Sequence, residues 1–170
     1  QGSFLQSVDY RYNVRGWLTS INNASLTLDG RNDDTGDVFG MELTYDSPTA
    51  LSYKNGENGI STAQGFYNGN ISEVVWRSSS DNTQRAYSYG YDRASRLTEA
   101  NYHTQGTEGD DYRMWGVGYD ANGNIQGLVR QGLTAGDPYD RQDTGRDWST
   151  VDDLHYRYQG NRLVNVRDQA

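Results

Sequence analysis

Aromatic side chains alternate with small and polar ones in the middle of the chain. Tyr87, Tyr89 and Tyr91 are two residues apart, so an extended backbone places their rings on one face. Residues 92–96 are of types that favour a turn, and a second extended run starts at Leu97. The pattern predicts a β-hairpin, in which a tight polar turn joins two strands.

Four other stretches repeat this pattern with variations. Each copy has an anchor tyrosine, a turn that contains Gly, Asn, Asp or Ser, and an aliphatic residue four to six positions after the anchor. The five copies are Tyr10 to Ile21, Phe66 to Trp76, Tyr89 to Ala100, Val117 to Val129 and Tyr156 to Val166. Their anchors are Tyr12, Tyr67, Tyr91, Tyr119 and Tyr158. We therefore predict a repeat of hairpins with loops of variable length between them.

The segments between the copies are mostly polar. Phe39 to Tyr45 alternates well enough to be a further strand, whereas 46–63, 105–111 and 132–150 are predicted loops. A weak capping signal predicts a short helical turn at Ser149 to Asp153. No segment of twelve or more residues keeps a helical period of apolar positions. The predicted fold class is therefore all-β, built of consecutive antiparallel hairpins.

Composition narrows the class of protein. The hydrophobic fraction of 34% includes all 14 tyrosines, aromatic residues make up 12%, and the net charge is −8 over 170 residues. A disordered chain would have fewer aromatic residues, so we predict an ordered fold with tyrosines in its core. The acidic balance argues against nucleic acid as a partner, and no apolar run approaches the roughly 18 residues needed for membrane insertion as a helix. The absence of cysteine excludes disulfides and thiolate metal sites.

The length fits one domain that covers residues 1–170. Its first residues, QGSFLQSVDYRY, include no methionine and no apolar leader segment. We expect either a segment of a longer repetitive chain or a unit that assembles with copies of itself.

The five copies resemble the YD repeats of the Rhs and teneurin families, whose pattern is roughly Tyr-x-Tyr-Asp-x-x-Gly-Arg-Leu. The closest copy has Tyr89, Tyr91, Asp92, Arg96 and Leu97 at the matching positions. Ser95 stands where the family usually has glycine. The other matching positions are Tyr12, Tyr67, Tyr119, Asp120, Gly123, Ile125, Tyr158, Arg162 and Leu163. The resemblance runs from about Val8 to Val166, which is most of the chain.

In those families the hairpins pair laterally into a long sheet that spirals into a hollow β-shell. In bacterial members the shell can enclose a toxic C-terminal domain. The resemblance implies a curved or spiralling sheet, part of such a shell, that acts as a non-enzymatic scaffold enclosing or displaying a cargo. Its partners would be other YD repeats of the same polypeptide, or identical copies paired edge to edge into a tube or filament. A bacterial protein of this type would be secreted or lie at the cell surface.

Two acidic segments contain side-chain oxygens of the kind that bind calcium. In Asp120 to Asn124 the glycine is the fourth residue of the segment and position twelve is Gln131, which does not fit a calcium loop. An Asn-Gly turn between two strands is the preferred interpretation of that segment. Asn32 to Asp37 contains more side-chain oxygens. Both a calcium site and a solvated loop are possible interpretations of that segment. We expect no other cofactor.

Candidate catalytic residues are few. The carboxylate pairs Asp33/Asp34, Asp110/Asp111 and Asp152/Asp153 consist of sequence neighbours, which point to opposite faces of an extended chain and would not converge on one glycosidic bond. His103 and His155 are the only histidines, and no Gly-x-Ser-x-Gly elbow accompanies them. We predict structural roles for both and no enzymatic activity.

The aromatic residues allow one alternative function. Trp17, Trp76, Trp115 and Trp148, together with the tyrosines, could form a stacking platform for glycans, which would make the chain a carbohydrate-binding module. The competing interpretation is that the tyrosines form cross-strand ladders, since every copy carries them and a binding site needs only one set. We prefer the ladder and keep the glycan platform as the alternative.

Overall fold

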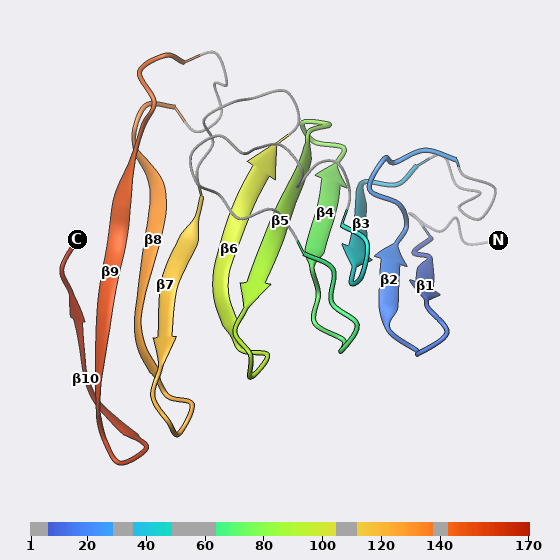
Figure 1. The fold of residues 1–170 in the computed structure, drawn as a ribbon. Helices are drawn as coiled ribbons and strands as arrows, with labels where there is room; N and C mark the ends of the chain where they lie inside the picture. Colours follow the sequence, from blue (N-terminus) through green and yellow to red (C-terminus); the bar gives the residue numbers. More distant parts are fainter. Residues whose placement is uncertain (1–6, 29–35, 49–63, 105–111, 138–142) are drawn as a thin grey trace. The chain divides into compact units, whose positions relative to one another are not determined.

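The computed structural model describes residues 7–28, 36–48, 64–104, 112–137 and 143–170 (Figure 1). The described residues form strands, turns and irregular segments, and they contain no helix. The strands are β1 (Tyr10–Tyr12), β2 (Leu18–Ile21), β3 (Phe39–Thr44), β4 (Glu73–Ser78), β5 (Gln84–Tyr91), β6 (Leu97–Thr104), β7 (Met114–Tyr119), β8 (Ile125–Ala135), β9 (Asp147–Gln159) and β10 (Arg162–Asp168). The predicted all-β class is confirmed.

The strands form one sheet in which the order along the sheet is the order along the chain, from β1 to β10. The strand pairs with a described register are antiparallel. The chain is therefore a succession of hairpins, as the repeat predicted. Contacts group the residues into two compact units, 1–88 with 103–106 and 89–102 with 107–170.

The turn between β7 and β8 shows how the hairpins close. The backbone N–H of Asp120 donates to the carbonyl of Asn124, and the N–H of Gly123 donates to the carbonyl of Asp120. The Asp120 side chain accepts the backbone N–H groups of Asn122 and Asn124, at 2.9 and 2.8 Å, and the Asn124 amide at 2.8 Å. The Asn124 bonds, that of the side chain foremost, lower the pKa of Asp120. Gly123 has a φ of 84°, which suits glycine.

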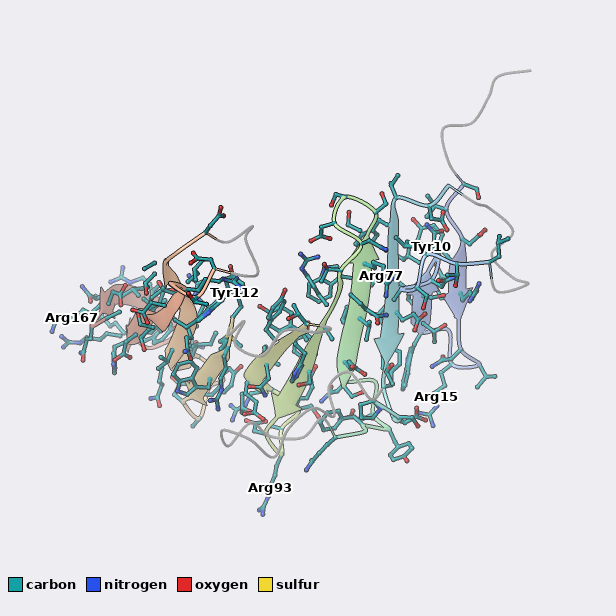
Figure 2. The ribbon with its side chains drawn as sticks, turned by 90° about the horizontal axis from the view of Figure 1, so that it is seen from above. Tyr10, Arg15, Arg77, Arg93, Tyr112 and Arg167 are labelled. Carbon is teal, nitrogen blue, oxygen red and sulfur yellow. The ribbon has the colours of Figure 1, made fainter. Side chains whose placement is uncertain are left out.

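The same closure recurs in two other turns. Asn13 and Asp92 each accept the N–H of the residues two and four positions on, at 2.8–3.0 Å. In both turns the fourth residue has a positive φ, 76° at Gly16 and 62° at Ser95. Bonds from Arg96, that of its backbone N–H foremost, lower the pKa of Asp92. The neighbouring Arg93 points away from this turn (Figure 2). The predicted turn at 92–96 is confirmed, and its carboxylate fixes it.

Each of three hairpins carries a bulge at an equivalent position. The anchor tyrosine pairs with the aliphatic residue of its own copy, and the register shifts directly after that residue. The pairs are Tyr12 with Leu18, Tyr119 with Ile125, and Tyr158 with Leu163. A bulge bends a strand and increases its twist. The repeat thus fixes a backbone irregularity as well as a pattern of side chains.

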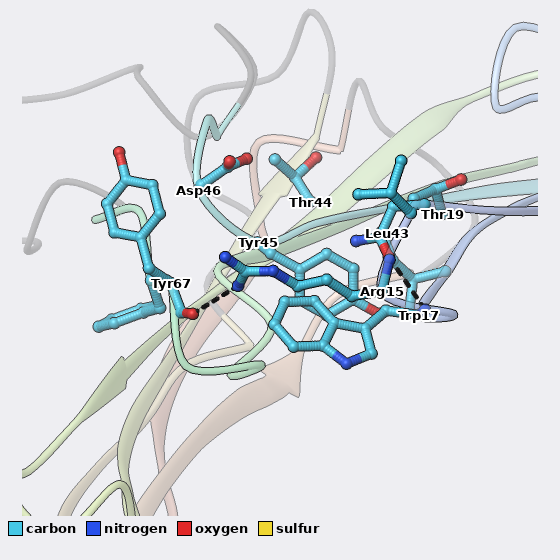
Figure 3. Close-up of a pocket in the computed structure, with 11 residues that line it drawn as sticks. Arg15, Trp17, Thr19, Leu43, Thr44, Tyr45, Asp46 and Tyr67 are labelled. Carbon is cyan, nitrogen blue, oxygen red and sulfur yellow. Dashed lines mark hydrogen bonds between the residues drawn. The ribbon is translucent and has the colours of Figure 1, made fainter.

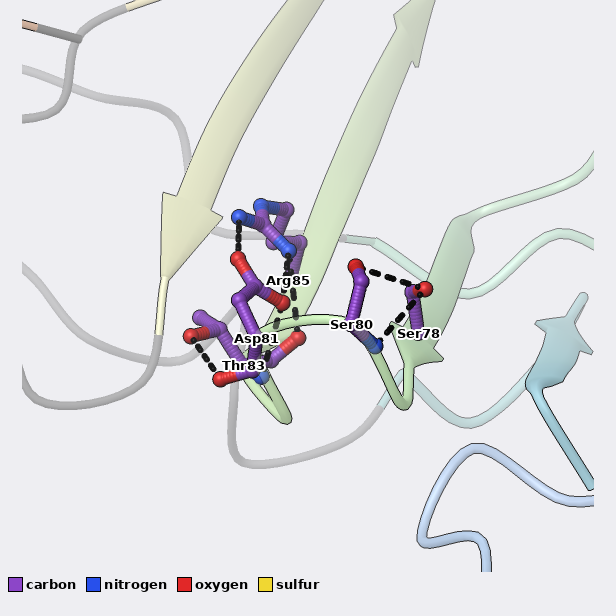
Figure 4. A network of polar contacts seen from close by, with 5 residues as sticks. All are labelled: Ser78, Ser80, Asp81, Thr83 and Arg85. Atoms are coloured by element: carbon purple, nitrogen blue, oxygen red, sulfur yellow. Dashed lines mark hydrogen bonds and ion pairs between the residues drawn. The ribbon is translucent and has the colours of Figure 1, made fainter. Parts of the chain in front are cut away.

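The turn between β4 and β5 is closed by a different network (Figure 4). Asp81 forms an ion pair with Arg85 and accepts the N–H of Thr83 at 3.2 Å. Ser78 and Ser80 bond to each other through their hydroxyls at 3.0 Å. This turn joins two successive hairpins. It therefore lies at the opposite end of the strands from the three turns that Asn13, Asp92 and Asp120 close.

The core is small and rich in polar groups. The fully buried apolar residues of the described part are Ala24, Val75, Ala86, Ala100 and Val117. Nine polar residues are also buried there, among them Glu73, Ser88, Asn101 and His103. No described tyrosine is among the buried residues, and Tyr67 is 73% exposed. The prediction of a core built of tyrosine is wrong: the described tyrosines stay partly or largely exposed, and Tyr45 and Tyr119 bond through their hydroxyls to a neighbouring hairpin.

The second predicted copy, Phe66 to Trp76, is not a hairpin. Only its last part belongs to a strand, β4, and Tyr67 precedes that strand. The N–H of Phe66 donates to the carbonyl of Tyr45, and the N–H of Ser72 donates to that of Thr44. The segment therefore closes a hairpin whose other strand is β3. The predicted strand at Phe39 to Tyr45 is confirmed.

The segment 132–150 was predicted to be a loop with a helical turn at its end, and this is wrong at both ends. β8 continues to Ala135 and β9 starts at Asp147. Ser149 and Thr150 pair with Gly132 and Gln131 of β8, and this ladder outweighs a weak capping signal. The described residues include no helix long and apolar enough to span a membrane.

A glycine pair tests how the turns are fixed. Gly123→Ala is expected to lower the free energy of unfolding by about 1–2 kcal/mol, since the left-handed conformation is unfavourable for alanine. Gly118→Ala is the control, because a Cβ at either glycine meets no atom within 4 Å and Gly118 has no positive φ. Urea unfolding of both variants measures the difference. Equal effects would contradict the assigned role of the left-handed turn residue.

Candidate functional site

Tyrosine hydroxyls connect successive hairpins. The hydroxyl of Tyr45, which directly follows β3, donates to the carbonyl of Leu18 in β2 at 2.8 Å. The hydroxyl of Tyr119 in β7 donates to the carbonyl of Leu97 in β6 at 2.6 Å. In both cases the acceptor is the aliphatic residue that follows the turn of the preceding hairpin. The hydroxyl therefore ties one hairpin to the next.

The last residue of the preceding turn adds a contact to the tyrosine ring. The rings of Trp17 and Tyr45 are 5.0 Å apart at 42°. The Arg96 guanidinium lies 4.5 Å from the centre of the Tyr119 ring, and its Nη1 is 3.4 Å from the carbonyl of Asp120. We call this combination, a hydroxyl bond to the aliphatic residue's carbonyl and a ring contact to the residue before it, the tyrosine joint.

The connection between β8 and β9 uses other groups. The Asn124 amide donates to the Asn161 side chain at 3.2 Å, so the turns of these two hairpins are linked directly. Arg130 of β8 donates to Asp152 of β9 at 2.6 Å. The predicted anchor Tyr158 pairs with Leu163 inside its own hairpin.

The tyrosine joint identifies Tyr45 as an anchor, which the sequence pattern does not reveal. Tyr45 and Asp46 form a YD dipeptide at the end of β3, but the residues that complete its copy come only after position 65. A motif with fixed spacing fails at such a distance. The sequence pattern points to Tyr67 as the anchor instead, and Tyr67 lies outside the strands. The dipeptide itself was the signal that could have revealed Tyr45.

A pocket of about 360 Å³ lies next to this joint in the first unit (Figure 3). It is lined by Asn13, Val14, Arg15, Trp17, Thr19, Leu43, Thr44, Tyr45, Asp46, Phe66 and Tyr67. The Arg15 guanidinium lies 5.0 Å from the Trp17 ring centre and donates to the carbonyl of Tyr67 at 2.7 Å. Partial burial raises the pKa of Tyr45. In the view of Figure 3 the side chains of Tyr67 and Asp46 project to the same side of Arg15.

The four tryptophans of the alternative glycan platform contact other side chains of the protein itself. Three carry an arginine two positions earlier whose guanidinium lies over the ring, and the fourth stacks on a tyrosine. The contacts are Arg15 on Trp17, Arg113 on Trp115, Arg146 on Trp148, and Tyr87 on Trp76, at 5.0–5.9 Å. Such contacts cover ring faces that a sugar would need.

A buried polar cluster lies between β4, β5 and β6 in the first unit. The Ser88 hydroxyl and Nε2 of His103 are 3.0 Å apart, and Glu73 is the cross-strand neighbour of Ser88. Ser88 is 1% exposed and Glu73 is 0% exposed. This set resembles the residue types of a nucleophilic triad, but burial closes the serine to substrate. The arrangement suits a structural hydrogen-bond network.

Burial lowers the pKa of His103, and the negative charge of Glu73 opposes that shift only in part. His155 lies in β9 instead, about half exposed, with Nε2 3.2 Å from Asp153. The two histidines therefore lie in different environments, one buried on β6 and the other exposed on β9.

The acidic residues form no metal centre in the described part of the chain, where no group of three or more His, Asp or Glu side chains could hold an ion. Asp152 and Asp153 turn to separate partners, Arg130 and His155. The pairs Asp33/Asp34 and Asp110/Asp111 and most of the segment Asn32 to Asp37 lie outside the described residues. Comparison with known protein families and with curated proteins found no match for the chain.

The buried histidine predicts a pH dependence. Since the pKa of His103 is lower in the folded chain than its usual 6.5, the unfolded chain takes up a proton first as the pH falls. Stability is thus fully present above that value and declines below it, by at most about 1.4 kcal/mol per pH unit. Urea unfolding from pH 7.5 down to about pH 5 measures the slope, over the range in which an unperturbed histidine titrates.

His103→Gln should flatten this slope, because glutamine keeps a polar group and does not titrate. His155→Gln is the matched control and should leave the slope close to that of the wild type. An unchanged slope in His103→Gln would show that another group controls the response.

Proposed function

We propose that this chain is a non-enzymatic β-scaffold of the YD-repeat type, part of a wall that encloses or displays a cargo. The observation that carries the proposal is the tyrosine joint, which occurs between β2 and β3 and again between β6 and β7. The residues that the repeat keeps are used to connect hairpins. A wall needs such internal connections in every copy, whereas a catalytic or binding site needs them once.

The turn chemistry supports the same proposal. Asn13, Asp92 and Asp120 close three turns in the same way, and the positive φ follows at the same position of each. This agrees with the Asp-x-x-Gly part of the YD pattern, whose resemblance implies a shell in a secreted or surface protein. A toxin domain, as in bacterial relatives, is the cargo that this resemblance suggests.

Glycan binding in the pocket is the second candidate function. The exposed ring of Tyr67 could stack on a sugar, while the remaining donors of Arg15 and the carboxylate of Asp46 could bind its hydroxyls. Its volume of about 360 Å³ is at the lower end of the range for small-molecule sites, about 300–1,000 Å³. This would suit one or two sugar units.

Variants of the joint test the scaffold through the stability of the fold. Tyr45→Phe and Tyr119→Phe should each lower the free energy of unfolding by about 1 kcal/mol, the usual effect of one lost hydrogen bond. Trp17→Ala should lower it by more than the loss of one hydrogen bond, because it removes a half-buried ring that packs on Tyr45. Chemical unfolding of each variant measures these losses.

Tyr67→Ala is the matched control for stability, because its ring is exposed and takes no part in a joint. A glycan array with the same proteins completes the test. A wild-type chain that binds glycans and a folded Tyr67→Ala variant that does not would favour the binding module. Joint variants as stable as the wild type would remove the support for the scaffold.

A further inference from the structure

The first and last strands of the sheet carry the two halves of one more tyrosine joint. β10 and β1 are the end strands, so each has one edge without a neighbouring strand in the described part of the chain. All side chains of β10 are exposed. Tyr12 on β1 is 61% exposed, and its hydroxyl has no acceptor among the described residues.

The β10 edge matches the acceptor side of a joint. Leu163 pairs with Tyr158 as Leu18 pairs with Tyr12, and the register shifts directly afterwards in both hairpins. The carbonyl of Leu18 points to the next hairpin, where it accepts the Tyr45 hydroxyl. By the same register the carbonyl of Leu163 points to the open edge.

Arg162 precedes Leu163 as Arg96 precedes Leu97. Arg96 lies over the ring of Tyr119 and reaches the carbonyl of Asp120. Arg162 bonds to Gln159 within its own turn, at 2.9 Å, and is otherwise exposed. Its guanidinium is therefore available for a tyrosine ring that arrives at this edge.

The β1 edge supplies the donor side. Tyr12 and Asn13 stand in the same order as Tyr119 and Asp120, and Asn13 closes its turn in the same way. The order along the sheet makes neighbouring strands alternate in direction, so β1 placed beside β10 would be antiparallel to it, as in every described pair of this sheet.

The neighbouring positions are complementary in the register of the joint between β2 and β3; in the joint between β6 and β7 the partner lies one residue further along, with Ala100 opposite Met114. In the joint between β2 and β3, Ser20 pairs with Glu42, and the next pair is apolar, Ile21 with Met41. In that joint the residue two positions after Leu18 pairs with the residue three positions before Tyr45. The same offsets from Leu163 and Tyr12 place Asn165 opposite Asp9, a polar pair like Ser20 and Glu42.

One residue further along both strands, where Ile21 pairs with Met41, the same offsets place Val166 opposite Val8. These two valines are 43% and 46% exposed, and they would form the apolar pair. A pair of this kind, buried between two strands, contributes to sheet stability. Both the hydroxyl joint and the adjoining strand register thus find their counterparts at the two edges.

We propose that the β10 edge binds the β1 edge of a second copy of this chain, head to tail, through a joint of Tyr12 with Leu163 and Arg162. The contact is heterologous, so each copy retains one free edge of either kind. The proposal rests on the scaffold function and names the surface by which one wall segment continues into the next.

Sedimentation velocity of the purified chain over a range of concentrations tests the association. The wild type should form dimers and longer species as the concentration rises. Tyr12→Phe removes only the hydroxyl and should raise the dissociation constant about five- to tenfold. Tyr12→Lys faces Arg162 with a like charge and should prevent association of that variant with itself. Arg162→Glu should do the same by removing the cation from the ring.

Mixing the two variants is the decisive step. Arg162→Glu retains an intact β1 edge and Tyr12→Lys retains an intact β10 edge, so an equal mixture should associate although neither variant does so alone. Arg93→Glu is the matched charge control, since Arg93 is an exposed residue of the turn between β5 and β6 and lies on neither end strand, and it should associate like the wild type. Circular dichroism confirms that every variant is folded.

Two results would overturn the proposal. One is a wild type that stays monomeric at its highest soluble concentration, and the other is an association that the Tyr12 and Arg162 variants leave unchanged. Neither result touches the scaffold function, which stands or falls on the stability of the Tyr45 and Tyr119 variants. The two proposals can therefore fail separately.

Discussion

Two junctions between successive hairpins depend on the hydrogen bond between a tyrosine hydroxyl and a backbone carbonyl of the preceding hairpin. The carbonyl belongs to the aliphatic residue after the turn, and in the first hairpin the register shifts immediately beyond it, at Leu18. A backbone carbonyl beside such an interruption needs a partner, because an unpaired polar group is costly when it is removed from water. The phenol supplies that partner and brings a ring that packs on the previous turn. Turn, bulge and tyrosine thus form one device.

Much of this device could be predicted from the sequence. The hairpins, the turn at 92–96 and the strand at 39–45 follow from alternation and turn chemistry, which act over a few residues. Tyr45 was missed because its partner, Leu18, lies in another hairpin and the rest of its copy is displaced along the chain. The length of β8 and β9 was missed because cross-strand pairing, which acts between segments, stabilises residues whose local signal is polar.

Burial was also predicted incorrectly, for a physical reason. Low aliphatic content suggested that tyrosine replaces it in the core, yet the buried positions hold small apolar residues and polar groups such as Ser88 and His103. Tyrosine has a hydroxyl that must be satisfied, so its place is at a seam where a carbonyl is available. A buried polar network is stable only when its members find partners, which makes the cluster at Glu73 sensitive to single changes.

The hairpin of β3 and β4 shows that this arrangement of hairpins tolerates a long segment between two paired strands. Two backbone bonds, from Phe66 to Tyr45 and from Ser72 to Thr44, clamp the strands where the intervening segment leaves the sheet. Once the ends of a segment are held together, the entropy of closing it grows only with the logarithm of its length. The hairpin is therefore nearly indifferent to how much sequence the clamp encloses. Such a position lets a repeat protein acquire new segments in evolution while the sheet keeps its register.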